Sequence, residues 1–286
     1  MDVTLCIDAD LDIATTALRI SLSNNVVLIG EDTDLLILLL HYSADQTSSY
    51  KLWYKTERET NSKTIHDIYQ YRDILGVEVC KTLLFIHAFG GCDTTSQFFG
   101  IGKGATYTKL RKSTELLSLS KTFSSQYATH DEVKKAGERA ASILYGGNKD
   151  EPINVLRKRL LGKKVAKAKT FVRPEKLPPT EDSLNYHSQR VHYQMMKWQG
   201  NKTIAAEEWG WRLHQGRLSP ITTMRNQAPD NLLKVIACNC TGDCSSLNCG
   251  CRRGGYSCTY MCGKCQVNEC TNVNSPLEDD EEKSND

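Results

Sequence analysis

Nine of the twelve cysteines lie close together near the end of this 286-residue sequence, with the spacing C-x-C-x3-C-x4-C-x-C-x6-C-x3-C-x2-C-x4-C from Cys238 to Cys270. Thiolates are soft ligands, and tetrahedral sites made of sulfur favour zinc. Three zinc ions need about twelve coordination positions, and nine thiolates provide twelve when three of them bridge two ions. The spacing therefore predicts a compact cluster of about three zinc ions, because two separate four-cysteine sites would leave one thiol over.

The alternative use of so many thiols is a disulfide-linked module of a secreted protein. The odd number of clustered cysteines and the lack of an export signal at the N-terminus favour metal binding instead. The other cysteines, Cys6, Cys80 and Cys92, are scattered along the chain, and we expect buried thiols at these positions.

The cysteine spacing resembles that of the tesmin-type CXC domain, a small module folded around a nine-cysteine zinc cluster. Asn272 matches the closing asparagine of that family. DNA-reading members usually carry two copies and place a tyrosine before the fourth cysteine, whereas this chain has one copy and Asn248 at that position. The resemblance implies that the zinc ligands are Cys238, Cys240, Cys244, Cys249, Cys251, Cys258, Cys262, Cys265 and Cys270.

Carboxylates follow two apolar runs in the N-terminal part of the chain. Residues 26–29 and 82–89 are predicted to be strands buried on both faces of a parallel sheet. The first run is followed by Asp32 and Asp34, and the second by Asp93. Because ligands collect at the carboxyl ends of parallel strands, we expect these aspartates to meet at one edge of the sheet.

A further acidic set, Asp8, Asp10 and Asp12, stands at the start of a helix predicted over residues 12–23. Carboxylates gathered without basic partners favour a hard cation, Mg²⁺ or Mn²⁺. Two such ions about 4 Å apart activate a water and stabilise the leaving oxygen in phosphodiester cleavage. The alternative is that these aspartates are helix N-caps and turn residues, and their spacing leaves both interpretations open.

The segments EDTDLL (31–36), GCD (91–93) and GIGKGA (100–105) together resemble the flap-endonuclease branch of the PIN-like nucleases over roughly residues 8–112. The resemblance implies that DNA backbone binds to glycine amides and a lysine, and that five aspartates bind metal, with Asp8 as a shifted alternative in the helix pair. The implied DNA-binding residues are Gly100, Gly102, Lys103 and Gly104, and the implied catalytic residues are Asp10, Asp12, Asp32, Asp34 and Asp93.

In that family this segment is the second half of the catalytic domain, and Met1 lies only nine residues before Asp10. We therefore expect an α/β fold with a partial PIN-like parallel sheet, whose missing strand leaves an apolar face and unpaired backbone exposed. Such a chain is expected to be a truncated product or to need a protein or second chain to complete it. The two modules together resemble uncharacterised animal proteins, some of them associated with transposons.

Charge, apolar runs and aromatic residues indicate how the rest of the chain is organised. Net charge is +2, and the longest apolar run, residues 35–40, is far shorter than the ~18 residues that cross a bilayer. Residues 50–55 alternate as in a half-exposed strand, and Trp198, Trp209 and Trp211 are predicted to pack in a core. The predicted regions are a nuclease core without its N-terminal half (1–112), a helical extension (113–165), a basic helical linker region broken by prolines (166–235), the zinc cluster (236–273) and an acidic disordered tail (274–286).

Basic residues are concentrated between residues 157 and 176, with nine Lys or Arg against one Glu. Such a block is either a solvated helix face or a strip that contacts phosphates and serves as a nuclear address. A nuclear or otherwise cytoplasmic protein is expected. The phosphate-contacting interpretation uses Arg157, Lys158, Arg159, Lys163 and Lys164, with Lys167, Lys169, Arg173 and Lys176 beyond them.

The sequence as a whole favours a metal-dependent, structure-specific DNA endonuclease-like protein with a zinc-binding CXC module, impaired when alone. The expected cofactors are about three structural zinc ions and catalytic Mg²⁺ or Mn²⁺, and the expected partner is DNA, with RNA as a further substrate class and no membrane. The alternative is a non-catalytic nucleic-acid or chromatin adaptor that uses the zinc cluster. His87 is predicted to be a core histidine rather than a ligand, and His187 and His192 have no assigned role.

Overall fold

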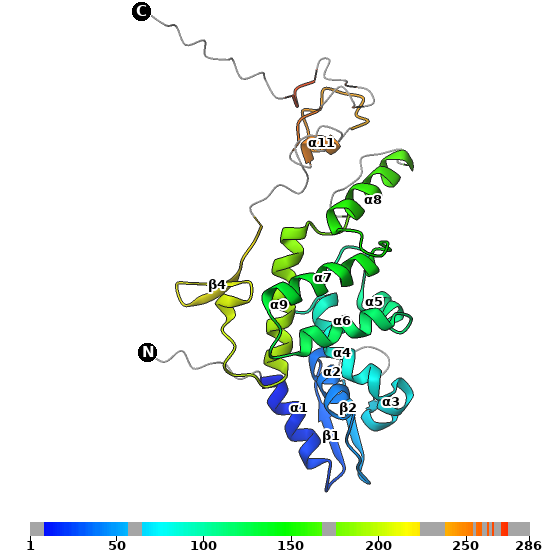
Figure 1. The fold of residues 1–286 in the computed structure, drawn as a ribbon, viewed down its shortest axis with the longest axis vertical. Helices are drawn as coiled ribbons and strands as arrows, with labels where there is room; N and C mark the ends of the chain where they lie inside the picture. The colour runs from blue at the N-terminus through cyan, green and yellow to red at the C-terminus, as the bar shows by residue number, and fades with distance from the viewer. Residues whose placement is uncertain are drawn as a thin grey trace, which may run out of the picture. The chain divides into compact units, whose positions relative to one another are not determined.

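The computed structural model describes residues 9–56, 65–167, 176–223, 238–253, 256–258, 262, 265 and 270–273 (Figure 1). The chain forms two compact units. The first comprises Met1–Asn154 with Glu181–Thr223, and the second comprises Val155–Thr180 with Met224–Asp286. None of the helices in the described ranges is long and apolar enough to span a membrane.

The N-terminal part of the first unit is a small α/β layer. Its sheet has the strand order β1-β2-β3, with β1 parallel to β2 and β2 antiparallel to β3. The elements are α1 (Ala9–Ile20), β1 (Val26–Ile29), α2 (Thr33–Tyr42), β2 (Leu52–Lys55) and β3 (Ile65–Asp67). The strand predicted at 26–29 is confirmed, whereas the strand predicted at 50–55 begins at Leu52 and the helix predicted at 12–23 lies three residues earlier. The side chains of β2 alternate between buried and half-buried.

One face of this sheet is open. Val27 and Ile29 point to the same face as Ile65, since Ile29 is paired with Lys55 and Lys55 with Ile65. The exposed fractions are 53% for Val27, 54% for Ile29 and 58% for Ile65. Among the described strands β1 lies at the edge of the sheet, so an apolar face and an unpaired edge occur together.

Residues 82–89 are helical, so the second predicted strand is wrong. They belong to α4 (Val77–Gly90), in which Leu84, Phe85 and Phe89 are fully buried. A helix that is surrounded by protein on all sides has a continuous apolar sequence, which periodicity cannot distinguish from a buried strand. The fold is mixed α/β with small sheets, and the run that was expected to extend a parallel sheet forms the central helix instead.

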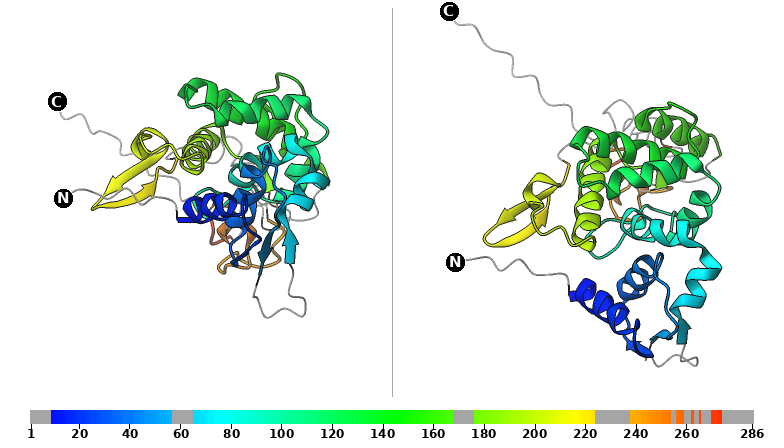
Figure 2. Two further views of the ribbon diagram at one scale, coloured as in Figure 1. Left: turned by 90° about the horizontal axis from the view of Figure 1, so that it is seen from below. Right: turned by 60° about the horizontal axis from the view of Figure 1, so that its bottom comes forward.

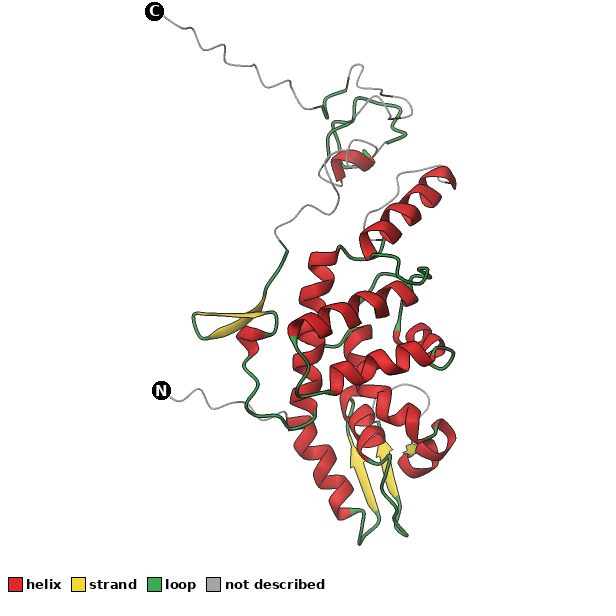
Figure 3. Ribbon diagram, viewed as in Figure 1, coloured by secondary structure: helices red, strands yellow, loops and turns green. Residues whose placement is uncertain are grey.

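Most of the first unit is helical and packs around α4 (Figure 3). Phe85 and Phe89 of α4 stack at 5.0 Å between ring centroids, and Phe123 of α6 lies 5.1 Å from Phe85. A capping box of Thr129 and Glu132 begins α7. The helices are α3 (Ile68–Leu75), α5 (Lys103–Leu110), α6 (Thr114–Ser124), α7 (His130–Leu144) and α9 (Glu181–Trp198).

The region expected to be broken by prolines contains α9, an 18-residue helix. Pro178 and Pro179 precede this helix and Pro220 follows it, so the prolines bound the element rather than interrupt it. Beyond α9 lie η2 (Ala206–Glu208) and a hairpin of β4 (Trp211–His214) and β5 (Arg217–Pro220), which extends away from the helices in both views of Figure 2. Trp198 and Trp209 are buried, as predicted for core residues, whereas Trp211 is half-buried on β4.

In the second unit, regular structure within the described residues is limited to α8 (Ile153–Lys167), which enters this unit at Val155, and the short α11 (Gly250–Arg253). Its core is a cluster of cysteines, against which Val273 packs. Because few apolar side chains are available here, the sulfur atoms themselves form the buried interior of this small module.

Candidate functional site

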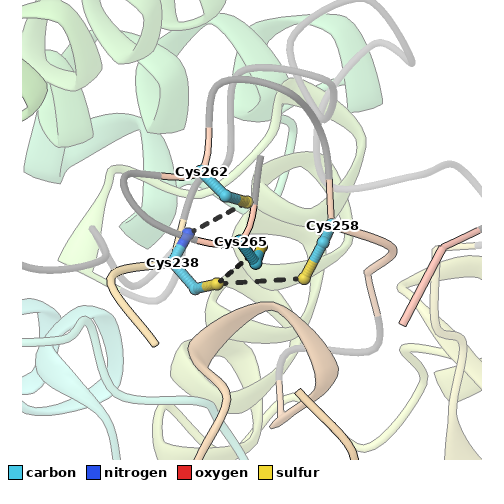
Figure 4. A group of neighbouring side chains, drawn as sticks. All are labelled: Cys238, Cys258, Cys262 and Cys265. Atoms are coloured by element: carbon cyan, nitrogen blue, oxygen red, sulfur yellow. Dashed lines mark hydrogen bonds between the residues drawn. The ribbon is translucent and has the colours of Figure 1, made fainter. Parts of the chain in front are cut away.

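The structure brings all nine predicted zinc ligands together. Eight of these cysteines are buried, and Cys240 is half-buried. The Sγ atom of Cys238 lies 3.8 Å from that of Cys258 and 3.9 Å from that of Cys265 (Figure 4). A disulfide needs about 2.0 Å between sulfurs, whereas ligands of a tetrahedral zinc ion at about 2.3 Å lie about 3.8 Å apart. The spacing of the sulfurs is therefore that of a metal centre.

The ligand groups of this cluster overlap. Four sets of four cysteines have all their sulfurs within 4.8 Å of one another, and Cys238 and Cys258 each belong to three sets. Sharing of sulfurs between sets is what bridging thiolates require when nine ligands serve several ions. The four sets are Cys238, Cys258, Cys262, Cys265; Cys238, Cys249, Cys251, Cys258; Cys238, Cys240, Cys244, Cys249; and Cys244, Cys258, Cys265, Cys270.

Hydrogen bonds from two side chains hold the loops of the cluster. Arg252 of α11 donates from Nε to the carbonyl of Cys244 at 2.7 Å and from Nη2 to the carbonyl of Thr271 at 3.0 Å. Asn272 donates from Nδ2 to the carbonyl of Tyr256 at 2.8 Å and to Sγ of Cys258 at 3.4 Å. Donors of this kind orient a thiolate and stabilise its charge, which gives the closing asparagine a structural role.

Burial disfavours thiolate formation in this cluster. It raises the pKa of Cys238 to about 12, and it also raises the pKa values of Cys244, Cys251 and Cys258. Burial acts in the same direction on Cys249, but the Arg252 amide and the neighbouring thiols lower its pKa to about 7. A zinc ion held by these thiols would have to displace their protons, so its binding would release protons and would weaken at acid pH.

The predicted acidic residues are dispersed over several elements. Asp10 and Asp12 lie in the first turn of α1, and Asp93 is exposed in the turn after α4. Asp32 caps α2, with its Oδ1 accepting from the amide of Asp34 at 2.9 Å. Within the described ranges no three of these carboxylates have oxygens within 4.8 Å of one another. The N-cap alternative is thus confirmed for Asp32.

Asp34 has a partner that the spacing did not reveal. Its Oδ1 is hydrogen-bonded to Nε2 of His87, which lies on α4 and stacks on Trp198 with 5.6 Å between ring centroids. The side chain of His87 is 2% exposed and that of Asp34 is 18% exposed, so the imidazole supports a carboxylate that water reaches. His87 is a core histidine, as predicted, and its charged partner is 53 residues away in sequence.

The glycine-rich segment before α5 is held by its neighbours. Phe98 and Ile101 are buried on either side of Gly100, whose φ of +71° favours glycine. Gly102 is the N-cap of α5, and within the described residues no side-chain cap hydrogen bond is made there. A Cβ at Gly102 would meet nothing within 4 Å, so this backbone is open to a ligand from outside.

The basic residues of α8 fall into two groups. Lys158, Lys163 and Lys164 are exposed, and no acidic residue occurs along this helix. Arg157 and Arg159 are half-buried, and Arg157 donates to the carbonyl of Pro178. Lys176 is exposed, whereas Lys169 and Arg173 and the side chain of Lys167 lie outside the described residues, as do Asp8, Cys6 and the acidic tail.

The chain was compared with protein-family models, with curated proteins and with solved structures, and none of them matches it.

Proposed function

We propose that the protein is a zinc-dependent nucleic-acid-binding protein. The observation that supports this best is the set of overlapping four-cysteine groups, with sulfurs at the spacing of tetrahedral zinc ligands. The nine thiolates would hold about three structural ions, which cross-link loops that have little other core. The resemblance to the CXC module, which occurs in DNA-binding proteins, adds to this support and favours a nuclear location.

The charge of the same unit favours a polyanionic partner. Lys158, Lys163 and Lys164 are exposed on α8, and Arg253 is exposed on α11 beside the cluster. Lysines that neutralise phosphates release counterions, which supplies affinity without sequence preference. The absence of the family's tyrosine, with Asn248 in its place, also favours backbone contact over base reading.

Metal analysis and salt-dependent DNA binding test this proposal together. Protein purified under reducing conditions should carry about three zinc ions per chain. The slope of log affinity against log salt should fall by about 0.9 for each phosphate contact removed, and thus by up to about 2.7 when the three lysines of α8 are changed to Glu. Changing the exposed Lys121, Lys149 and Lys202 to Glu makes the same change in net charge outside α8 and should leave most of the slope intact.

Two results would contradict the proposal. Zinc-free protein with nine reactive thiols in the cluster would remove the metal centre. DNA affinity that is independent of salt, or that responds equally to both sets of charge reversals, would remove α8 from the binding surface.

A second candidate function is metal-dependent phosphodiester hydrolysis by the N-terminal region. The observation that favours it is the water-accessible carboxylate of Asp34, held by the buried His87. The oxygen ligands suit Mg²⁺ or Mn²⁺, and Asp10, Asp12, Asp32, Asp34 and Asp93 would hold the ions. No three of these carboxylates converge within the described residues, so binding of the ions would have to draw α1, α2 and the turn after α4 closer together.

The open sheet face bears on this second candidate. A protein or second chain that covers Val27, Ile29 and Ile65 would complete the layer and would be needed for full activity. The test is cleavage of end-labelled flap and single-stranded DNA with Mg²⁺ or Mn²⁺, comparing the protein with its Asp34→Asn variant. Cleavage that the substitution abolishes would support a nuclease, and no cleavage by either protein would leave zinc-dependent binding as the function.

A further inference from the structure

The segment between α4 and α6 is strongly basic. Residues 91–113 contain Lys103, Lys109, Arg111 and Lys112 against one acidic residue, Asp93. Lys103, Arg111 and Lys112 are exposed, whereas Lys109 donates from Nζ to the carbonyl of Leu144 at 2.6 Å. Exposed cationic side chains are complementary to a phosphate backbone.

One aromatic ring is exposed in this basic segment. Phe98 is 6% exposed, and its ring lies 5.1 Å from Phe89 and 4.8 Å from His187. Ile101, three residues later, is also buried, whereas Phe99 between them is 50% exposed. Packing on both sides fixes the loop, so the Phe99 ring is presented to water from a rigid support.

The backbone next to Phe99 is also accessible. A Cβ built at Gly100, Gly102 or Gly104 would meet no atom within 4 Å, and in the part of the chain that the structure describes no side chain caps the start of α5. A nucleotide presents an aromatic base and a phosphate at a short distance from each other. The exposed ring, the uncapped amides and Lys103 match these two parts of one ligand.

We propose that Phe99 stacks on an unpaired base of a single-stranded nucleic acid, while adjacent phosphates lie near Lys103 and the start of α5. This inference rests on the proposed nucleic-acid-binding function and names its substrate class. Stacking on a ring tolerates every base, because each base has a π-face. Duplex DNA offers such a face only at its ends, so single strands should bind more tightly than a blunt duplex of equal length.

The test measures binding of a single-stranded oligonucleotide that carries 2-aminopurine, whose fluorescence falls when it stacks. Phe99→Ala should lower affinity between about 5- and 150-fold and should abolish the quenching. The salt dependence should not change, because no charge is lost. Phe99→Tyr keeps an aromatic ring, so its affinity and its fluorescence quenching should equal those of the unchanged protein. Tyr127→Ala, which removes another exposed aromatic ring, should behave as the unchanged protein does.

Affinity and quenching that are the same in Phe99→Ala as in the unchanged protein would overturn the stacking role. Tighter binding to a blunt duplex than to the single strand would overturn it as well. If the unchanged protein binds no nucleic acid at all, the proposed function itself fails. If it binds in a salt-dependent way and Phe99→Ala binds equally well, only the stacking role of Phe99 fails. Because Phe99 is exposed, thermal denaturation of each variant should match that of the parent protein.

Discussion

A Cβ atom built at Gly137 would lie 1.9 Å from Oγ of Ser188, so the backbone of α7 contacts α9 without an intervening side chain. Ser188 is fully buried, and its hydroxyl donates to the carbonyl of Leu184 at 2.8 Å. Figure 1 shows α7 crossing α9, and α9 also packs against α4. The helical backbone conformation at Gly137 does not itself need a glycine. The close packing against Ser188 does, because it leaves no room for a side chain.

Gly137→Ala should therefore destabilise the protein. Alanine is a better helix former than glycine by about 1 kcal/mol, but forcing a methyl group into Ser188 typically costs about 1–3 kcal/mol. The free energy of unfolding in urea measures the difference. Gly104→Ala is the matched control, because a Cβ there meets nothing within 4 Å and should leave stability unchanged or raise it by up to about 1 kcal/mol.

A double variant tests the cause. Ser188→Gly should recover part of the loss when it is combined with Gly137→Ala, since it removes the two atoms that would lie within 3 Å of the new methyl group. Equal stability of Gly137→Ala and Gly104→Ala would contradict the close crossing of α7 and α9.

The cysteine cluster could be predicted from the sequence because its ligands are close neighbours along the chain. Short loops between cysteines leave few ways to surround a metal, so spacing carries most of the geometry. The same holds for residues 26–29, where a β-branched run is too short for a buried helix. Both predictions depend on local chemistry alone.

The helix α4 and the Asp34–His87 pair show what local chemistry cannot supply. Residues 82–89 are apolar throughout because α4 is surrounded by protein, and a uniform run carries no period that separates a helix from a strand. Asp34 and His87 meet only because α2 packs on α4. With residues 82–89 assigned to a strand, neither their partners nor the position of Asp93 could be predicted correctly.

Substitution of Cys258 should remove more zinc than substitution of Cys240. Cys258 belongs to three of the four overlapping groups and Cys240 to one, so loss of Cys258 affects more than one ion. Native mass spectrometry should show Cys258→Ser with at most about one zinc ion and Cys240→Ser with about two, against about three in the parent protein. Cys92→Ser should keep the full number, since Cys92 lies near Thr94 and Thr95 outside the cluster. Equal zinc in all three variants would contradict shared ligands.

Two buried histidines should make stability depend on acid pH. Burial lowers the pKa of His187 to about 3, with Arg190 nearby acting in the same direction, and burial lowers the pKa of His192 to about 4, with His130 adding to it. Unfolded histidine titrates near 6.5, so between pH 6.5 and 4 the unfolded state binds protons that the folded state does not. These two histidines should therefore leave the free energy of unfolding unchanged above pH 6.5, and should lower it as the pH falls below 6.5.

Each of the two histidines contributes up to about 1.4 kcal/mol per pH unit in this window. Urea unfolding at pH 7, 6 and 5 measures the dependence, and His192→Gln should reduce its slope relative to the parent protein. His214→Gln is the control, because His214 is exposed on β4 and should not alter the slope. A slope that is unchanged in His192→Gln would show that this imidazole titrates alike in both states.

Two substitutions of Asp32 separate its role as a cap from its role as a metal ligand. Asn caps a helix about as well as Asp does, so Asp32→Asn should keep the bond to the amide of Asp34 and leave the free energy of unfolding nearly unchanged. Asp32→Ala removes that bond and should cost about 1 kcal/mol. If the carboxylate also binds Mg²⁺ or Mn²⁺, both variants should lose metal-dependent cleavage equally, although only one loses stability. If cleavage is instead retained in Asp32→Asn and reduced in Asp32→Ala, cleavage depends on the stability of α2 and not on the carboxylate. Asp32 would then be a helix cap alone.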